Sequence, residues 1–133
     1  MYHGSCLCGT VKFSISSKIQ DIVFCHCSLC RKAQGSAFAT NGNVKASHFK
    51  FISGEGNLST YQYSETQSKL FCSSCGSPIM SKNSLNPDVI RIRLGTIESD
   101  INEVPEAHIF VSSKAKWDTI CDDIPQYDEY TPK

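Results

Sequence analysis

Clustered cysteines constrain this chain more than any other sequence feature. Seven of its eight cysteines form three groups, which are Cys6 and Cys8, then Cys25, Cys27 and Cys30, then Cys72 and Cys75. The N-terminus, MYHGSCLCG, has no basic start followed by an apolar run, so it does not predict secretion. We therefore expect a cytoplasmic protein, and in a reducing compartment clustered cysteines are more often metal ligands than disulfides.

The segment Cys72-Ser73-Ser74-Cys75-Gly76 gives the strongest metal signal. A C-x-x-C followed by glycine makes a tight turn in which two sulfurs converge on one ion, and structural zinc takes four ligands. The nearest match in kind for the second pair is Cys6 and Cys8, which Gly9 follows. We predict one structural Zn²⁺ held by these four cysteines. A thioredoxin-like redox dithiol is the alternative, but that motif opens a helix in a βαβ unit, whereas these surroundings are β-rich.

The middle cluster offers three sulfurs rather than four. Three protein ligands with an open fourth position are typical of reactive zinc, so Cys25, Cys27 and Cys30 predict a second, reactive Zn²⁺. Three thiolates on Zn²⁺ leave a net charge of about −1, which disfavours hydroxide formation and suits a soft ligand such as a small-molecule thiol. Alternatively His26, Cys121 or an acidic residue closes the site structurally. The residues alone leave both interpretations open.

Alternation of apolar and polar residues predicts several short strands. Val11, Phe13 and Ile15 face one way, and in the run from Val89 to Leu94 two arginines flank Ile92 on the opposite face. Further candidates are 49–52, 58–63 and 107–111. A single short helix is predicted over 28–34, with Ser28 as its N-cap and Gly35 as its stop. These patterns predict a mostly β domain with many short strands, in one domain over residues 1–133 that zinc helps to hold together.

Charge and hydropathy limit the possible partners. Lysine plus arginine equals aspartate plus glutamate, 13 against 13, so we expect no nucleic-acid partner. No apolar run approaches the roughly 18 residues that span a bilayer, so we expect no membrane insertion. The oligomeric state is not indicated.

Five ordered segments resemble the glutathione-dependent formaldehyde-activating enzymes and their centromere-protein V relatives. Gly4-Ser-Cys-Leu-Cys-Gly-Thr-Val-Lys-Phe13 resembles the opening strand of that family. The segment from Cys25 to Phe38 resembles its central C-H-C-x-x-C-R motif, and Phe71-Cys-Ser-Ser-Cys-Gly-Ser-Pro78 resembles its second zinc half. Ile92 to Thr96 and His108 to Ser113 resemble its later strands.

The resemblance implies an all-β, tent-like fold of small antiparallel sheets bridged by zinc, and it implies a carbon–sulfur lyase. Carried over by position, Cys6, Cys8, Cys72 and Cys75 hold the structural zinc, and Cys25, Cys27 and Cys30 form the catalytic zinc site. The implied reaction joins glutathione to formaldehyde to give S-hydroxymethylglutathione, or reverses it. The implied partner is therefore a small-molecule thiol, with no separate organic cofactor.

Two other functions compete with this one. A non-catalytic zinc module would bind a partner through its β scaffold, with a second metal that is purely structural. A thiol-based sensor would release zinc when the exposed three-cysteine cluster is oxidised. Three sulfurs without a fourth favour the enzyme.

Overall fold

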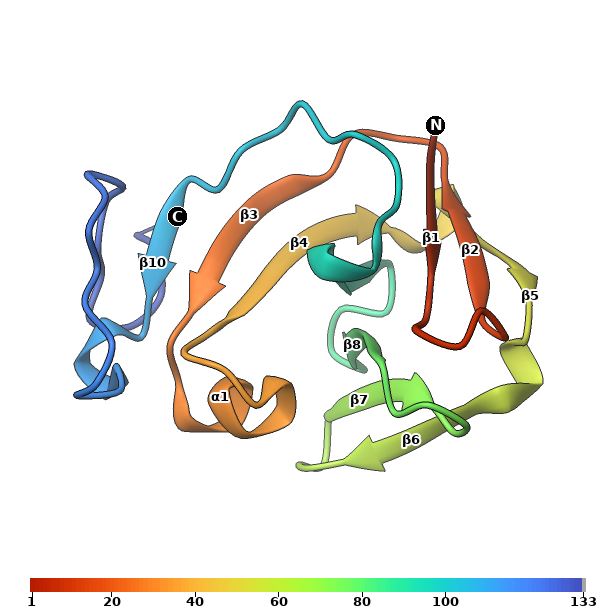
Figure 1. Ribbon diagram of the computed structural model, residues 1–133, viewed down its shortest axis with the longest axis horizontal. Helices are drawn as coiled ribbons and strands as arrows, with labels where there is room; N and C mark the ends of the chain where they lie inside the picture. Colours follow the sequence, from red (N-terminus) through yellow and green to blue (C-terminus); the bar gives the residue numbers. More distant parts are fainter. Residues whose placement is uncertain (133) are drawn as a thin grey trace.

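Short β-strands make up most of the structure, a computed structural model that describes residues 1–132 (Figure 1). Its strands are β1 (Tyr2–Ser5), β2 (Lys12–Ile15), β3 (Gln20–Cys25), β4 (Ala39–Lys45), β5 (Phe49–Ser53), β6 (Leu58–Gln62), β7 (Gln67–Cys72), β8 (Pro78–Asn83), β9 (Val89–Arg93) and β10 (Ala107–Ile109). The α-helix is α1 (Ser28–Gln34). Four 3-10 turns are η1 (Ala46–His48), η2 (Glu55–Asn57), η3 (Leu94–Thr96) and η4 (Val111–Ser113).

Two sheets organise these strands. A three-stranded sheet has the order β1-β2-β5, and a seven-stranded sheet has the order β10-β3-β4-β9-β8-β7-β6. Neighbouring strands are antiparallel except β10, which runs parallel to β3. The predicted all-β class with one short helix is confirmed, and the parallel pair is the exception to its antiparallel pattern.

Strand alternation gives the seven-stranded sheet two different faces. Ile90 and Ile92 of β9 pack into the main apolar core, together with buried residues of the three-stranded sheet such as Phe13 and Ile15. The opposite face carries polar side chains. Residues paired across antiparallel strands share a face, so the register shows which residues belong to it. We call this the polar face; the register places on it Asn41 and Asn43 of β4, Arg91 and Arg93 of β9, Ser81 of β8 and Lys69 of β7.

A second, smaller apolar cluster lies on the polar-face side of the sheet, where α1 and β10 meet β3 and β4. Its buried members are Val23, Cys25, Cys30, Ala39, Ala107 and Ile109. In Figure 1, α1 lies below the ends of β3 and β4, and β10 lies beyond β3 at the edge of the sheet. The central cysteine segment is thus held between a helix and a sheet rather than in a free loop.

Helix α1 has the predicted span, but its start differs from the prediction in detail. Cys27 is the N-cap in place of Ser28, because the Sγ atom of Cys27 accepts a hydrogen bond from the Cys30 N–H at 3.3 Å. Gly35 ends the helix as predicted, with φ 67° in the left-handed region that glycine adopts at low cost. One of the candidate metal ligands therefore also fixes the first turn of the helix.

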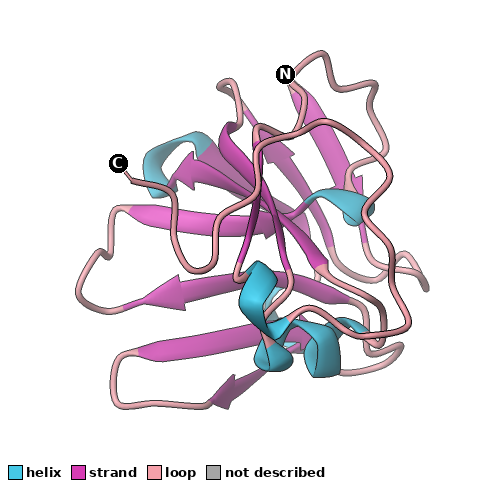
Figure 2. Ribbon diagram, turned by 90° about the vertical axis from the view of Figure 1, so that its left-hand side faces the viewer, coloured by secondary structure: helices cyan, strands magenta, loops and turns pink. Residues whose placement is uncertain are grey.

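The segment after η3 returns across the molecule to reach β10 (Figures 1 and 2). It is joined to β1 by a bridge between Gly4 and Ile97 and by the Glu98 N–H, which donates to the His3 carbonyl at 2.8 Å. Further along, the Tyr2 hydroxyl donates to Glu103 at 2.8 Å. Among the described residues, no helix is long and apolar enough to cross a membrane.

Gly4 provides a test of how tightly the three-stranded sheet packs. It pairs with Phe13 across β1 and β2, and a Cβ atom at Gly4 would run into the Phe13 ring. Because Phe13 is fully buried and its ring cannot move aside, we expect Gly4→Ala to destabilise the fold by about 1–3 kcal/mol. Thermal unfolding measures the loss. Gly56→Ala is the matched control, since a Cβ there meets nothing within 4 Å; equal melting temperatures for the two variants would contradict the expectation.

Candidate metal centres

The structure brings together the four cysteines predicted to form the structural site. The Sγ atoms of Cys6, Cys8, Cys72 and Cys75 all lie within 4.8 Å of one another. Cys6 Sγ is 3.6 Å from Cys8 Sγ, which is 3.9 Å from Cys72 Sγ. Sulfurs placed tetrahedrally about 2.3 Å from a zinc ion lie about 3.8 Å apart, so this cluster fits a tetrahedral metal. We call it the four-sulfur cluster.

Two tight turns aim these sulfurs at one another. In the turn after β7, the Gly76 N–H donates to the Cys72 carbonyl at 2.8 Å, and Gly76 has φ 78°. In the loop between β1 and β2, the Gly9 N–H donates to the Cys6 carbonyl at 3.2 Å, and Gly9 has φ 83°. The glycine that follows each cysteine pair thus supplies the left-handed backbone that the turn requires.

Hydrogen bonds also join the two turns and reach the sulfurs. The Leu7 N–H donates to the Ser77 Oγ at 2.8 Å, across 70 positions of sequence. The Val11 N–H donates to Cys6 Sγ at 3.2 Å, and Asn57 Nδ2 donates to Cys72 Sγ at 3.5 Å. Donors aimed at sulfur favour thiolates, the form in which cysteine binds metals. A hydrogen bond with Ser77 lowers the pKa of the Cys75 thiol to about 5.

The second group contains three cysteines, as the sequence predicted. The Sγ atoms of Cys25, Cys27 and Cys30 lie within 4.8 Å of one another, with Cys25 Sγ 3.5 Å from Cys27 Sγ. Cys25 ends β3, Cys27 caps α1, and Cys30 lies in the helix. We call these residues the three-sulfur cluster. Cys25 and Cys30 are buried and Cys27 is partly exposed, so the cluster has one solvent-facing side.

Within residues 1–132, no histidine, acid or further cysteine joins the three-sulfur cluster as a fourth potential ligand. His26 is turned away from it, because its Nε2 atom lies 2.8 Å from Nδ1 of His108. Cys121 is exposed, and its thiol donates to the Thr119 carbonyl at 3.5 Å. Of the two interpretations that the sequence left open, the geometry favours three protein ligands.

A buried chain of polar groups runs outward from His26. His26 is fully buried and His108 is 3% exposed, and Nε2 of His108 lies 3.1 Å from the Asp122 carboxylate. Burial is the main cause that lowers the pKa of His26. No local sequence pattern links His108 to His26, because 82 positions separate the two histidines. These three side chains connect the C-terminal segment to the backbone that carries Cys25 and Cys27.

Cationic side chains of the polar face are within electrostatic reach of the three-sulfur cluster. Arg93 is 3% exposed, and it forms no ion pair with a carboxylate among residues 1–132. Its Nη1 atom donates to Ser81 Oγ at 3.4 Å and to the Arg91 carbonyl at 3.3 Å, while its Nε atom has no hydrogen-bond partner in the described part of the chain. Burial lowers the pKa of Lys69 and of Arg93, and the cysteine thiolates partly oppose this in both.

This arrangement identifies the thiolates as the counter-charge of the two cations. A buried charge is costly unless it is compensated, and the cysteines are the anionic groups that act on both Lys69 and Arg93. Within the cluster, hydrogen bonds with Cys25 and then Cys30 are the main cause that lowers the pKa of the Cys27 thiol. The sequence reasoning paired the two arginines of β9 on one face but did not connect them to the cysteines.

A small β protein with two cysteine clusters, each able to hold a metal ion such as zinc, is the class that this fold and these sites define. Residues 1–113 match the family model described as "Glutathione-dependent formaldehyde-activating enzyme". The chain belongs to this family.

Two other comparisons show further similarity. The chain is 30% identical over 125 residues to a Halomonas elongata protein provisionally named a glutathione-dependent formaldehyde-activating enzyme, a match that covers 88% of this chain and 79% of the relative. The crystal structure of a Rhodobacter sphaeroides protein has a TM-score of 0.63 and 27% identity, and the match covers 77% of this chain and 97% of that one.

Cys75→Ser tests the four-sulfur cluster. Removing one of four ligands that join the loop after β1 to the turn after β7 should release the metal and unfold the protein, or lower its melting temperature by at least 10 °C. Metal content by elemental analysis and thermal unfolding measure the effect. The control is Cys121→Ser, which removes an exposed thiol outside both clusters. A Cys75→Ser protein with the metal content and melting temperature of the control would refute the assignment.

Proposed function

We propose that this protein is a zinc-dependent carbon–sulfur lyase that joins glutathione, or a closely related small thiol, to formaldehyde and also catalyses the reverse. The observation that carries the proposal is the three-sulfur cluster, which has three potential ligands, no fourth within residues 1–132, and one partly exposed side. Membership of the glutathione-dependent formaldehyde-activating enzyme family supports the choice of thiol and aldehyde.

The two clusters have different roles in this proposal. Cys6, Cys8, Cys72 and Cys75 hold a structural zinc, because four thiolates leave no position for a substrate. Cys25, Cys27 and Cys30 hold the reactive zinc. When bound there, the zinc ion supplies a fourth coordination position at which a thiol binds as its thiolate.

Cationic side chains near the three-sulfur cluster offset its negative charge. Three cysteine thiolates and a substrate thiolate carry more negative charge than one Zn²⁺ balances, and the cationic Lys69 and Arg93 offset the excess. In the overall reaction, the thiol sulfur bonds to the carbonyl carbon and the thiol proton ends on the carbonyl oxygen, so no oxidant or reductant is needed. Arg93 is buried on this side of the sheet, and the low local dielectric around a buried group strengthens these interactions.

We also propose that one zinc-binding domain spans residues 1–133 and that the protein acts in the cytoplasm, where glutathione is a reducing thiol. A non-catalytic zinc module is the competing function. It predicts that a thiol has no effect on either cluster and that both metals serve folding alone.

Cys27→Ser separates the enzyme from the non-catalytic module. Cys27 is the partly exposed member of the cluster, so its loss should abolish formation of S-hydroxymethylglutathione, at least 100-fold, while the four-sulfur cluster keeps the protein folded. Product formation, circular dichroism and metal content are measured beside Cys121→Ser. Should Cys27→Ser unfold the whole domain, or keep full activity, the catalytic role fails.

A native mass spectrum titrated with glutathione tests thiol binding directly. We expect two zinc ions per chain and a saturable glutathione adduct that the Cys27→Ser variant lacks. Two zinc ions without an adduct at millimolar glutathione would favour the non-catalytic module.

A further inference from the structure

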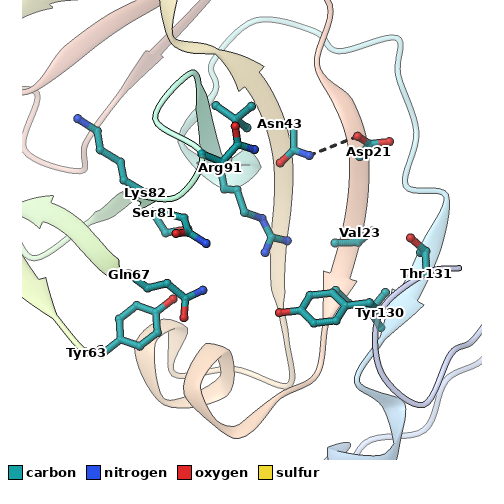
Figure 3. A pocket seen from close by; sticks show the side chains of 14 residues that line it. Asp21, Val23, Asn43, Tyr63, Gln67, Ser81, Lys82, Arg91, Tyr130 and Thr131 are labelled. Atoms are coloured by element: carbon teal, nitrogen blue, oxygen red, sulfur yellow. Dashed lines mark hydrogen bonds between the residues drawn. The ribbon is translucent and has the colours of Figure 1, made fainter. Parts of the chain in front are cut away.

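A cavity of about 330 Å³ opens on the polar face, and it is within the size range of small-molecule sites. Strands β3, β4, β8 and β9 supply part of its wall, and Tyr130 of the C-terminal segment closes one side. Figure 3 shows Arg91 extending into this cavity, with the rings of Tyr63 and Tyr130 on opposite sides of it and their hydroxyls directed inward. The established family membership assigns nothing to these residues.

Arg91 brings a positive charge into the cavity. Among residues 1–132 it forms no ion pair with a carboxylate. Asp21 is the acidic residue that lines the cavity, and its carboxylate accepts a hydrogen bond from Asn43 Nδ2 at 3.3 Å (Figure 3). A guanidinium presents a rigid planar set of N–H donors that matches a carboxylate, and tyrosine hydroxyls beside it can donate further hydrogen bonds. The cavity is therefore chemically suited to a carboxylate.

The cavity lies close enough to the three-sulfur cluster to serve the same ligand. Val23 lines the cavity and is two residues before Cys25 on β3, a distance of about 7 Å along a strand. Ile109 also lines the cavity and pairs with Cys25 across β10 and β3, so the cavity wall reaches a strand position next to the cluster. A thiol substrate with a carboxylate one or two residues from its sulfur spans this distance.

Two cations of β9 have separate surroundings. The charge of Cys30 acts on Arg93, which lies on the cluster side of the polar face. Arg91 is two residues earlier on the same face and opens into the cavity, about 7 Å further from that end of the strand. Arg93 donates to Ser81 Oγ and to the Arg91 carbonyl and lies outside the cavity lining, whereas the side chain of Arg91 extends into the cavity.

We propose that this cavity is a carboxylate-binding subsite in which Arg91 holds a carboxylate of the thiol substrate. The inference rests on the proposed function only in taking the carboxylate to belong to the thiol that the three-sulfur cluster handles. Its ligand class is a small acidic thiol whose carboxylate lies one to two peptide units from the sulfur. Thiols without a carboxylate at this distance bind more weakly.

Calorimetry with S-methylglutathione tests the subsite apart from metal chemistry, because its sulfur is methylated and cannot bind as a thiolate. In the zinc-loaded wild-type protein, we expect the dimethyl ester of this ligand to bind at least tenfold more weakly than the free acid. Arg91→Gln should weaken binding of the acid at least tenfold and abolish the difference between acid and ester. Arg91→Lys keeps the charge but loses the planar fork, so its affinity for the acid should lie between those of the wild type and Arg91→Gln.

Lys50→Gln is the matched control, since it removes an exposed cation on β5 of the other sheet. Each protein is first shown to be folded by its melting temperature and zinc content. Equal affinity of Arg91→Gln and Lys50→Gln for S-methylglutathione would overturn the subsite. If Arg91 governs that affinity but no S-hydroxymethyl product forms with wild-type protein, the proposed reaction fails and the carboxylate subsite stands.

The carboxylate could instead belong to the carbonyl substrate, if an oxo acid replaces formaldehyde. Kinetics with glyoxylate, an oxo acid, distinguish a carboxylate on the thiol from one on the carbonyl substrate. Should Arg91→Gln raise the KM for glyoxylate while S-methylglutathione binds as in the wild type, the carboxylate belongs to the carbonyl partner and the inference is wrong. An unchanged KM for a carbonyl substrate, with weakened S-methylglutathione binding, supports it.

Discussion

Convergence of Cys6, Cys8, Cys72 and Cys75 is the constraint on which the rest of the structure depends. The two cysteine pairs lie in the loop between β1 and β2 and in the turn between β7 and β8, so their contact connects the three-stranded sheet to the far part of the seven-stranded sheet. A metal bound there closes a loop of more than sixty residues, and metal binding energy then contributes to folding. A domain of this size with short strands gains most from such a link, because its apolar core is small.

Between the two sheets lies the main core, and this leaves the other side of the seven-stranded sheet for polar residues. Strand alternation places Ile90 and Ile92 in the core and Arg91 and Arg93 on the opposite face. Antiparallel pairing then aligns asparagine, serine and lysine side chains beside these arginines. The same alternation that builds the core therefore builds a cationic surface next to the three-sulfur cluster.

On that surface, the charges of the cysteine thiolates and of the cationic side chains stabilise each other. Lys69 and Arg93 are held where burial disfavours their charges, and the cysteine thiolates oppose that effect. The His26, His108 and Asp122 chain fixes the backbone between Cys25 and Cys27 from behind, so the three sulfurs keep one partly exposed side. The site thus combines a rigid frame, an offset charge and an opening, which is the arrangement that a thiol-handling centre requires.

The sequence by itself determined the β class, the short helix and the division of seven cysteines into a group of four and a group of three, because local spacing and alternation carry that information. It also indicated that two arginines share a face around Ile92. Only the tertiary structure decided that His26 points to His108, that the N-cap of α1 is Cys27, and that no fourth ligand within residues 1–132 meets the three-sulfur cluster. It also placed Lys69 and Arg93 where the charges of that cluster act on them, and Arg91 and Tyr63 in the cavity of the polar face. These contacts join residues tens of positions apart, and their partners are set by sheet register, which no local pattern encodes.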